Sequence, residues 1–130
     1  EYRIKERKGI IKQGVMIFEM IKTIIVVATI YHADPAQCNA DYLTTASMKT
    51  INESNPQGHR WIAVSRDLEK HGFKFGAKVR VSGAGKLDGI WTVEDRMNKR
   101  YTKRIDFLVN KEMTGGKWNN VKIILVNEKV

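Results

Sequence analysis

The chain is poor in cysteine, in long apolar runs and in acidic side chains, and each shortage narrows what the protein can be. Its one cysteine, Cys38, has no partner in the chain, so no intrachain disulfide can form. The redox compartment stays open, because oxidising compartments permit disulfides without requiring them. The sequence also has no internal repeat, no low-complexity tract and no heptad pattern, which excludes solenoids and coiled coils.

The longest apolar run, Thr23–Tyr31, is too short for a membrane-spanning helix, which needs about 20 apolar residues. The run is rich in β-branched residues and is not followed by a small-residue cleavage site. A buried strand therefore fits it better than the core of a signal peptide. We expect no transmembrane segment in this chain. Because the chain begins at Glu1 and not at Met, an upstream targeting segment stays open.

Basic residues are what the chain has in excess. Lys and Arg number 23 against 14 Asp and Glu, which gives a net charge of +9. Such a surface attracts polyanions such as nucleic acid, anionic lipid or the acidic polymers of a bacterial envelope, and charge alone does not choose among them. No nucleic-acid-binding motif accompanies the charge, so we do not expect nucleic acid as a partner. The histidines share no spacing and no zinc motif is present, so we expect no metal and no other cofactor.

Short apolar segments separated by turn residues predict a mainly β fold. Turns that recur about every ten residues favour a small closed barrel over a βαβ sheet, and closure removes exposed sheet edges. We expect a one- to two-turn helix over 66–72, and we divide the chain into an arm of uncertain structure over 1–22 and a barrel domain over 23–130. The expected strands span residues 23–31, 60–65, 78–83, 90–95, 104–109 and 120–126. Trp61 and Trp91 lie inside apolar strands and are predicted to belong to the core.

Four segments follow one another in a familiar order. They read WIAVSRDL, FGAKVRVSGAG, DGIWTVEDRMNKR and RIDFLVN, and the stretch ATIYHADPAQCNADYLTTAS precedes them. This order resembles the 3D domain, a family named for three aspartates. The family is a double-psi β-barrel related to membrane-bound lytic transglycosylase A and to rare-lipoprotein-A-like proteins. The version in this chain is similar to a divergent branch of gut bacteria and their phages.

The resemblance implies a small six-stranded double-psi β-barrel with one or two short helices. It also implies a lytic transglycosylase or glycoside hydrolase that acts on peptidoglycan. The catalytic acid of the transglycosylases falls on Asp106, with Asp95 as the neighbouring carboxylate and Asp67 as a possible third. The family's loop of Thr, Ala and a small residue falls on Thr44, Thr45 and Ser47, which the resemblance makes substrate-binding.

The loop between Asp95 and Asp106 carries Arg96, Lys99, Arg100, Lys103 and Arg104. We expect substrate contacts in this loop from its cations and its polar and aromatic side chains. The expected contacts are Arg96, Asn98 and Tyr101.

A transglycosylase can work with one carboxyl group, because the muramyl 6-hydroxyl attacks within the same molecule and gains from effective molarity. That carboxyl group must hold a proton near neutral pH, so burial or a like-charged neighbour must raise its pKa. A nearby arginine would lower the pKa instead. The alternative is therefore that Asp95 and Asp106 cap strand ends or form salt bridges, and that Asp67 caps a helix.

Two function classes stay open. The first is an enzyme with a single aspartate general acid and base, acting on peptidoglycan glycan strands in the bacterial cell envelope (periplasm or outer surface) or as a phage cell-wall lysin. The second is a non-catalytic carbohydrate-binding or virion or envelope assembly module on the same barrel. The sequence carries no sign of the oligomeric state.

Overall fold

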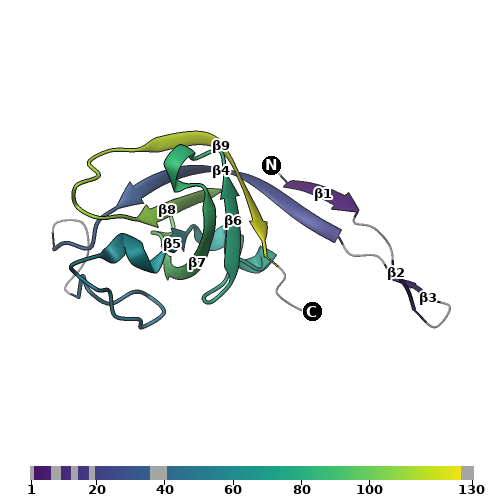
Figure 1. Cartoon of the computed structure of the whole chain (residues 1–130), viewed down its shortest axis with the longest axis horizontal. Coiled ribbons are helices and arrows are strands. Elements are labelled where there is room, and N and C mark those ends of the chain that lie inside the picture. Colours follow the sequence, from purple (N-terminus) through teal and green to yellow (C-terminus); the bar gives the residue numbers. More distant parts are fainter. Residues whose placement is uncertain (1, 7–9, 13–14, 18–19, 36–40, 127–130) are drawn as a thin grey trace.

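The computed structural model describes residues 2–6, 10–12, 15–17, 20–35 and 41–126, so Cys38 lies outside the described residues. Six strands close into a barrel in the order β4-β8-β5-β7-β6-β9, and β9 pairs back onto β4 (Figure 1). This confirms the predicted mainly β barrel of six strands. The barrel strands are β4 (Met20–Tyr31), β5 (Trp61–Val64), β6 (Lys78–Ser82), β7 (Gly89–Arg96), β8 (Arg104–Leu108) and β9 (Lys117–Leu125).

Two pairs of barrel strands are parallel. β4 runs parallel to β8, and β5 runs parallel to β7, whereas the other pairs in the barrel are antiparallel. Neither parallel pair can be joined by a tight hairpin, because parallel neighbours need a crossover connection. In this arrangement β8 lies between β4 and β5, although it comes after both of them in the sequence.

The N-terminal arm also forms strands. β1 (Tyr2–Glu6) pairs antiparallel with the first residues of β4, and β2 (Ile10–Lys12) pairs with β3 (Val15–Ile17). Figure 1 shows β2 and β3 at the end of the molecule farthest from the barrel. β4 crosses the predicted boundary between residues 22 and 23, and the division into arm and barrel stays a prediction.

The predicted helix over 66–72 is a 3-10 helix. It is η2 (Arg66–His71), and it ends at Gly72, whose φ of 98° is left-handed and favours glycine. Two further 3-10 helices are η1 (Pro56–His59) and η3 (Gly85–Leu87). No described helix is long and apolar enough to cross a membrane.

The barrel interior is filled by alternate side chains of its strands. Trp91 is fully buried as predicted, and its ring lies 4.7 Å from that of Phe107. Trp61 is only half-buried, contrary to the prediction. It precedes the buried Ile62 on β5, so it faces the other side of the sheet, where its ring stacks on His59 at 3.9 Å.

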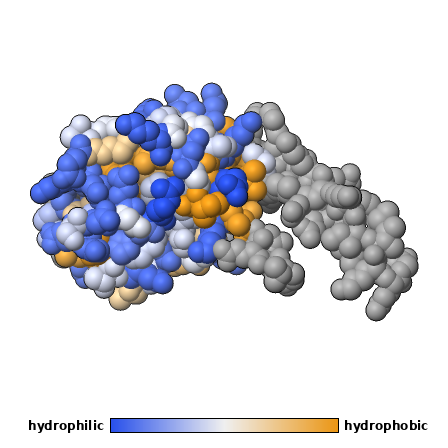
Figure 2. Space-filling view, viewed as in Figure 1, coloured by the Kyte–Doolittle hydropathy of each residue, from blue (hydrophilic) through white to orange (hydrophobic). Residues whose placement is uncertain are grey.

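Basic side chains are exposed on the outer face of β6 and β9. Its exposed side chains include Lys78, Arg80 and Lys122. Figure 2 shows an otherwise largely hydrophilic surface with an apolar area over β6 and β9. The apolar area is consistent with the half-buried Ile124 and Leu125 at the end of β9.

Candidate functional site

Four neighbouring strands place a row of small and polar side chains on the outer face of the barrel. In the strand register Asp106 of β8 lies between Thr29 of β4 and Ala63 of β5, and Ala63 also lies opposite Asp95 of β7. Successive strand residues face opposite sides, so the buried Ile105 and Phe107 point inward while Asp106 points outward. Because Ala63 has only a methyl group, little side-chain bulk lies between the two carboxylates.

An irregularity in β7 decides which carboxylate joins this row. Val93 lies opposite Ile62 but Asp95 lies opposite Ala63, so Glu94 is the additional residue of a β-bulge. In a regular register Glu94 would face the groove. Instead Glu94 is buried, with Lys49 Nζ 3.9 Å from its Oε2 atom.

Ala63, Asp95 and Asp106 of this row line a groove of about 700 Å3, a volume within the roughly 300–1,000 Å3 of small-molecule sites. Its walls come from the end of β4, from residues 41–46, from η2 and from the basic loop after β7. The lining residues are Ile30, Tyr31, Asp41, Thr44, Thr45, Ala46, Ala63, Arg66, Asp95, Arg96, Met97, Asn98, Arg100, Tyr101 and Asp106.

Burial raises the pKa of Asp106 above its ordinary value of 3.8. A hydrogen bond from Thr29 Oγ1 to Asp106 Oδ1, at 2.5 Å, opposes this shift, and so does the charge of Arg104. The negative charge of Asp95 adds to the rise. The balance is a carboxyl group that keeps its proton to a higher pH than an exposed aspartate does.

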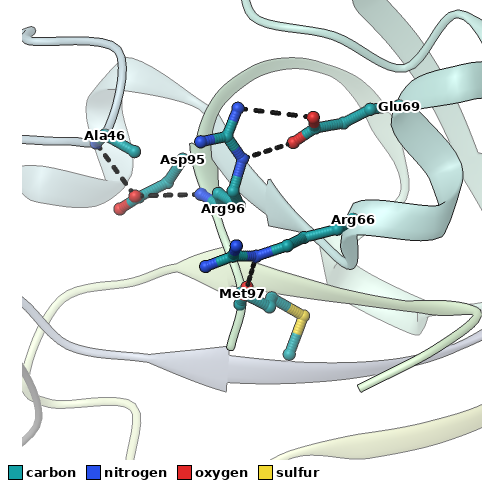
Figure 3. Close-up of polar contacts among 6 residues, drawn as sticks. All are labelled: Ala46, Arg66, Glu69, Asp95, Arg96 and Met97. Carbon is teal, nitrogen blue, oxygen red and sulfur yellow. Dashed lines mark hydrogen bonds and ion pairs between the residues drawn. The ribbon is translucent and has the colours of Figure 1, made fainter. Parts of the chain in front are cut away.

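Asp95 has a different environment. Its Oδ1 accepts hydrogen bonds from the backbone N–H groups of Ala46 and Arg96, each at 3.0 Å (Figure 3). Its Oδ2 accepts a hydrogen bond from the Tyr31 hydroxyl, also at 3.0 Å. These three donors fix the carboxylate at the edge of the groove. They also join the loop over the groove to β7 and to the end of β4.

Neither Asp95 nor Asp106 is held by a guanidinium group. Arg96 instead binds Glu69 through Nε at 2.6 Å and Nη2 at 3.3 Å, as Figure 3 shows. Among the described residues no ion pair joins Asp95 or Asp106 to an arginine or lysine. The salt-bridge alternative is therefore not the arrangement found for these two carboxylates.

Asp67 does not line the groove. It lies in the first turn of η2, where its Oδ2 accepts a hydrogen bond from the backbone N–H of Lys103 at 3.0 Å. This contact ties the basic loop to η2 just before β8 begins. The N-cap residue of η2 is Ser65, so Asp67 is neither the cap nor a third carboxylate of the groove.

Most of the predicted substrate contacts line the groove. Thr44, Thr45, Arg96, Asn98 and Tyr101 all do so.

Ser47 is not among the lining residues, and its hydroxyl lies 2.9 Å from that of Thr45. The ring of Tyr101 is covered by the guanidinium groups of Arg100 and Arg104, at 4.8 and 4.9 Å from its centroid.

The sequence reasoning missed Thr29, Tyr31 and Ala63. Alternation along 23–31 places Thr29 and Tyr31 on one face, but only the parallel β4–β8 pair brings that face beside Asp106. Within the described part of the chain no group of three or more His, Cys, Asp or Glu residues is arranged to hold a metal ion. Comparison with family models, curated proteins and solved structures gave no match.

Proposed function

We propose that the protein cleaves peptidoglycan glycan strands as a lytic transglycosylase, with Asp106 as the single general acid and base. One observation carries the proposal: Asp106 lines the same groove as Asp95 and has a pKa raised by burial. A general acid needs a raised pKa near its working pH.

The chemistry requires one proton to be given and one to be taken. The carboxyl group of Asp106 would donate its proton to the glycosidic oxygen as the bond from C1 to that oxygen breaks. The muramyl 6-hydroxyl of the same sugar would then attack C1, and the Asp106 carboxylate would accept the hydroxyl proton. The products are a free hydroxyl on the departing sugar and a 1,6-anhydro ring, and Asp106 is again protonated.

Asp95 would act on this step without touching the transferred proton. Its charge raises the pKa of Asp106 and favours the positive charge that develops at C1. Its three hydrogen bonds hold it in place while the substrate changes.

The same proposal includes membership of the 3D family and its double-psi barrel. Closure of six strands with two parallel pairs supports this, because both pairs need crossover connections. A bacterial cell envelope or a phage virion is the location that such a substrate would require.

The test is incubation with purified sacculi, followed by mass spectrometry of the released muropeptides. We expect anhydro-muropeptides from the wild type and at least a hundredfold less from Asp106→Asn, in line with the loss of a general acid. Glu112→Gln is the matched control, because Glu112 is exposed and lies outside the groove. Products with reducing ends would show hydrolysis instead.

The alternative is a non-catalytic glycan-binding or assembly module. The observation that favours it is the positive charge in the groove lining, to which Arg66 and Arg100 contribute. Pelleting of the protein with sacculi without any released product would support this alternative and overturn cleavage.

A further inference from the structure

The groove has two arginines whose charge no carboxylate neutralises. Arg66 donates from Nε to the backbone carbonyl of Met97 at 3.2 Å, and Arg100 donates from Nη2 to the Tyr101 hydroxyl at 2.7 Å. Both acceptors are neutral. In the part of the chain that the structure describes, neither guanidinium group has an ion-pair partner.

Arg96, from the same loop, shows the contrast. Its guanidinium group is bound at two points by Glu69, so its charge is already neutralised. Figure 3 shows Arg66 extending from η2 toward the side of the view on which Asp95 lies, whereas Arg96 turns toward Glu69. Two of the three arginines that line the groove thus keep an uncompensated charge.

Neutral acceptors orient these two arginines without using their charge. Each guanidinium group has five N–H donors, and one hydrogen bond leaves most of them for a ligand. The planar fork of arginine matches a carboxylate with two parallel hydrogen bonds. The arrangement is therefore suited to an anionic group of a bound molecule.

We propose that Arg66 and Arg100 form an anion subsite that binds a carboxylate of the peptide stem of the glycan substrate. This inference rests on the proposed function, since it assumes that the groove holds a peptidoglycan strand. Among the lining residues, Asp95 repels a substrate carboxylate, whereas Arg66 and Arg100 attract it.

The experiment is a titration of the protein with N-acetylmuramyl dipeptide that has a free carboxylate, followed by NMR or calorimetry. The same dipeptide with the carboxylate converted to an amide is the comparison ligand. We expect the wild type to prefer the carboxylate form by about tenfold or more, as hydrogen bonds to charged groups imply. The double variant Arg66→Gln/Arg100→Gln should lose this preference.

The matched control is Arg80→Gln/Lys122→Gln, which removes the same amount of positive charge. Both of its residues are exposed on the outer face of β6 and β9, outside the groove. The control should keep the preference for the carboxylate form. Equal loss in both double variants would overturn the subsite, because it would show attraction by net charge alone. A stronger preference for a glycerol phosphate oligomer would overturn the assignment to a carboxylate.

The two proposals fail separately. Release of anhydro-muropeptides together with equal binding of the acid and the amide would overturn the subsite and leave cleavage standing. Binding of the acid that depends on Arg66 and Arg100, without release of product from sacculi, would support the subsite and overturn cleavage.

Discussion

The carboxyl group of Asp106 combines burial with a neighbouring negative charge, and both raise its pKa. A raised pKa has a consequence for folding as well as for chemistry. Between 3.8 and the folded pKa the native state binds more protons than the unfolded state. Stability therefore falls as the pH rises through this window.

Asp106→Asn should remove this pH-dependent loss. We expect the variant to gain stability relative to wild type at pH 7 and to show a smaller difference below pH 3.8, where the carboxyl group is protonated in both states. Thermal unfolding of the variant and the wild type at both pH values measures this difference in stability. A difference that is the same at both pH values would contradict the raised pKa.

The same pKa sets the pH dependence of the proposed cleavage. The acid acts only while protonated, so release of anhydro-muropeptides should decrease as the pH rises above the folded pKa of Asp106. A pH series of product release from sacculi measures this. A decrease that begins already at pH 3.8 would mean that burial does not raise the pKa.

Tyr31→Phe should weaken cleavage without unfolding the barrel. It removes the hydroxyl group that donates to Asp95 Oδ2 at 3.0 Å, and we expect a loss of up to about tenfold in product release, as for one hydrogen bond. Tyr42→Phe is the control, because its hydroxyl binds the exposed Glu53 at 3.2 Å. Unchanged release from Tyr31→Phe would show that Asp95 needs no support from this side.

At the scale of elements, the end of η2 depends on a close approach of two segments. A Cβ atom on Gly72 would lie 2.7 Å from Leu125 Cδ1, whereas one on Gly76 would meet nothing within 4 Å. Both glycines have a positive φ, 98° and 88°, so alanine at either position costs about 1–2 kcal/mol.

Gly72→Ala should therefore reduce the free energy of unfolding by more than Gly76→Ala does. The difference between the two variants isolates the contact with Leu125, since the conformational cost is shared. Denaturant titration of both variants measures it. Equal losses would show that Leu125 moves aside at no cost.

The strands of the barrel could be predicted from sequence because alternation and turn residues are local signals. The stretch 104–109, for example, appears as β8 over Arg104–Leu108. The bulge at Glu94 could not be predicted, because it depends on the register between β5 and β7. Trp61 shows the same limit: an apolar stretch does not say which side of a strand faces the core.

The candidate site was predictable in part. Asp95, Asp106 and all of the expected substrate contacts except Ser47 line one groove. Asp67 does not, because its carboxylate is used by the backbone of Lys103. The partners of the two aspartates, Thr29 and Tyr31, depend on a parallel pairing between distant segments, which no local pattern reveals.

At the scale of the whole molecule, the barrel is closed without the N-terminal arm. Residues Thr23–Tyr31 of β4 carry its pairings with β8 and β9, whereas β1 pairs only with Met20–Ile24.

Deletion of residues 1–19 should therefore leave a folded barrel. We expect a single cooperative unfolding transition, with a midpoint close to that of the full chain, since the barrel core is untouched. Circular dichroism during thermal unfolding measures it. Loss of the transition would show that the arm and the barrel are one domain.

The position of β8 between β4 and β5 bears on when the protein can act. A ribosome delivers both of these strands before it delivers Asp106, and β9, which closes the barrel, follows last. A chain that has been made only as far as β7 therefore lacks Asp106, the residue proposed to carry the chemistry. The proposed acid would enter the groove only after both strand partners of β8 have been made, so a chain truncated before β8 should show no release of anhydro-muropeptides.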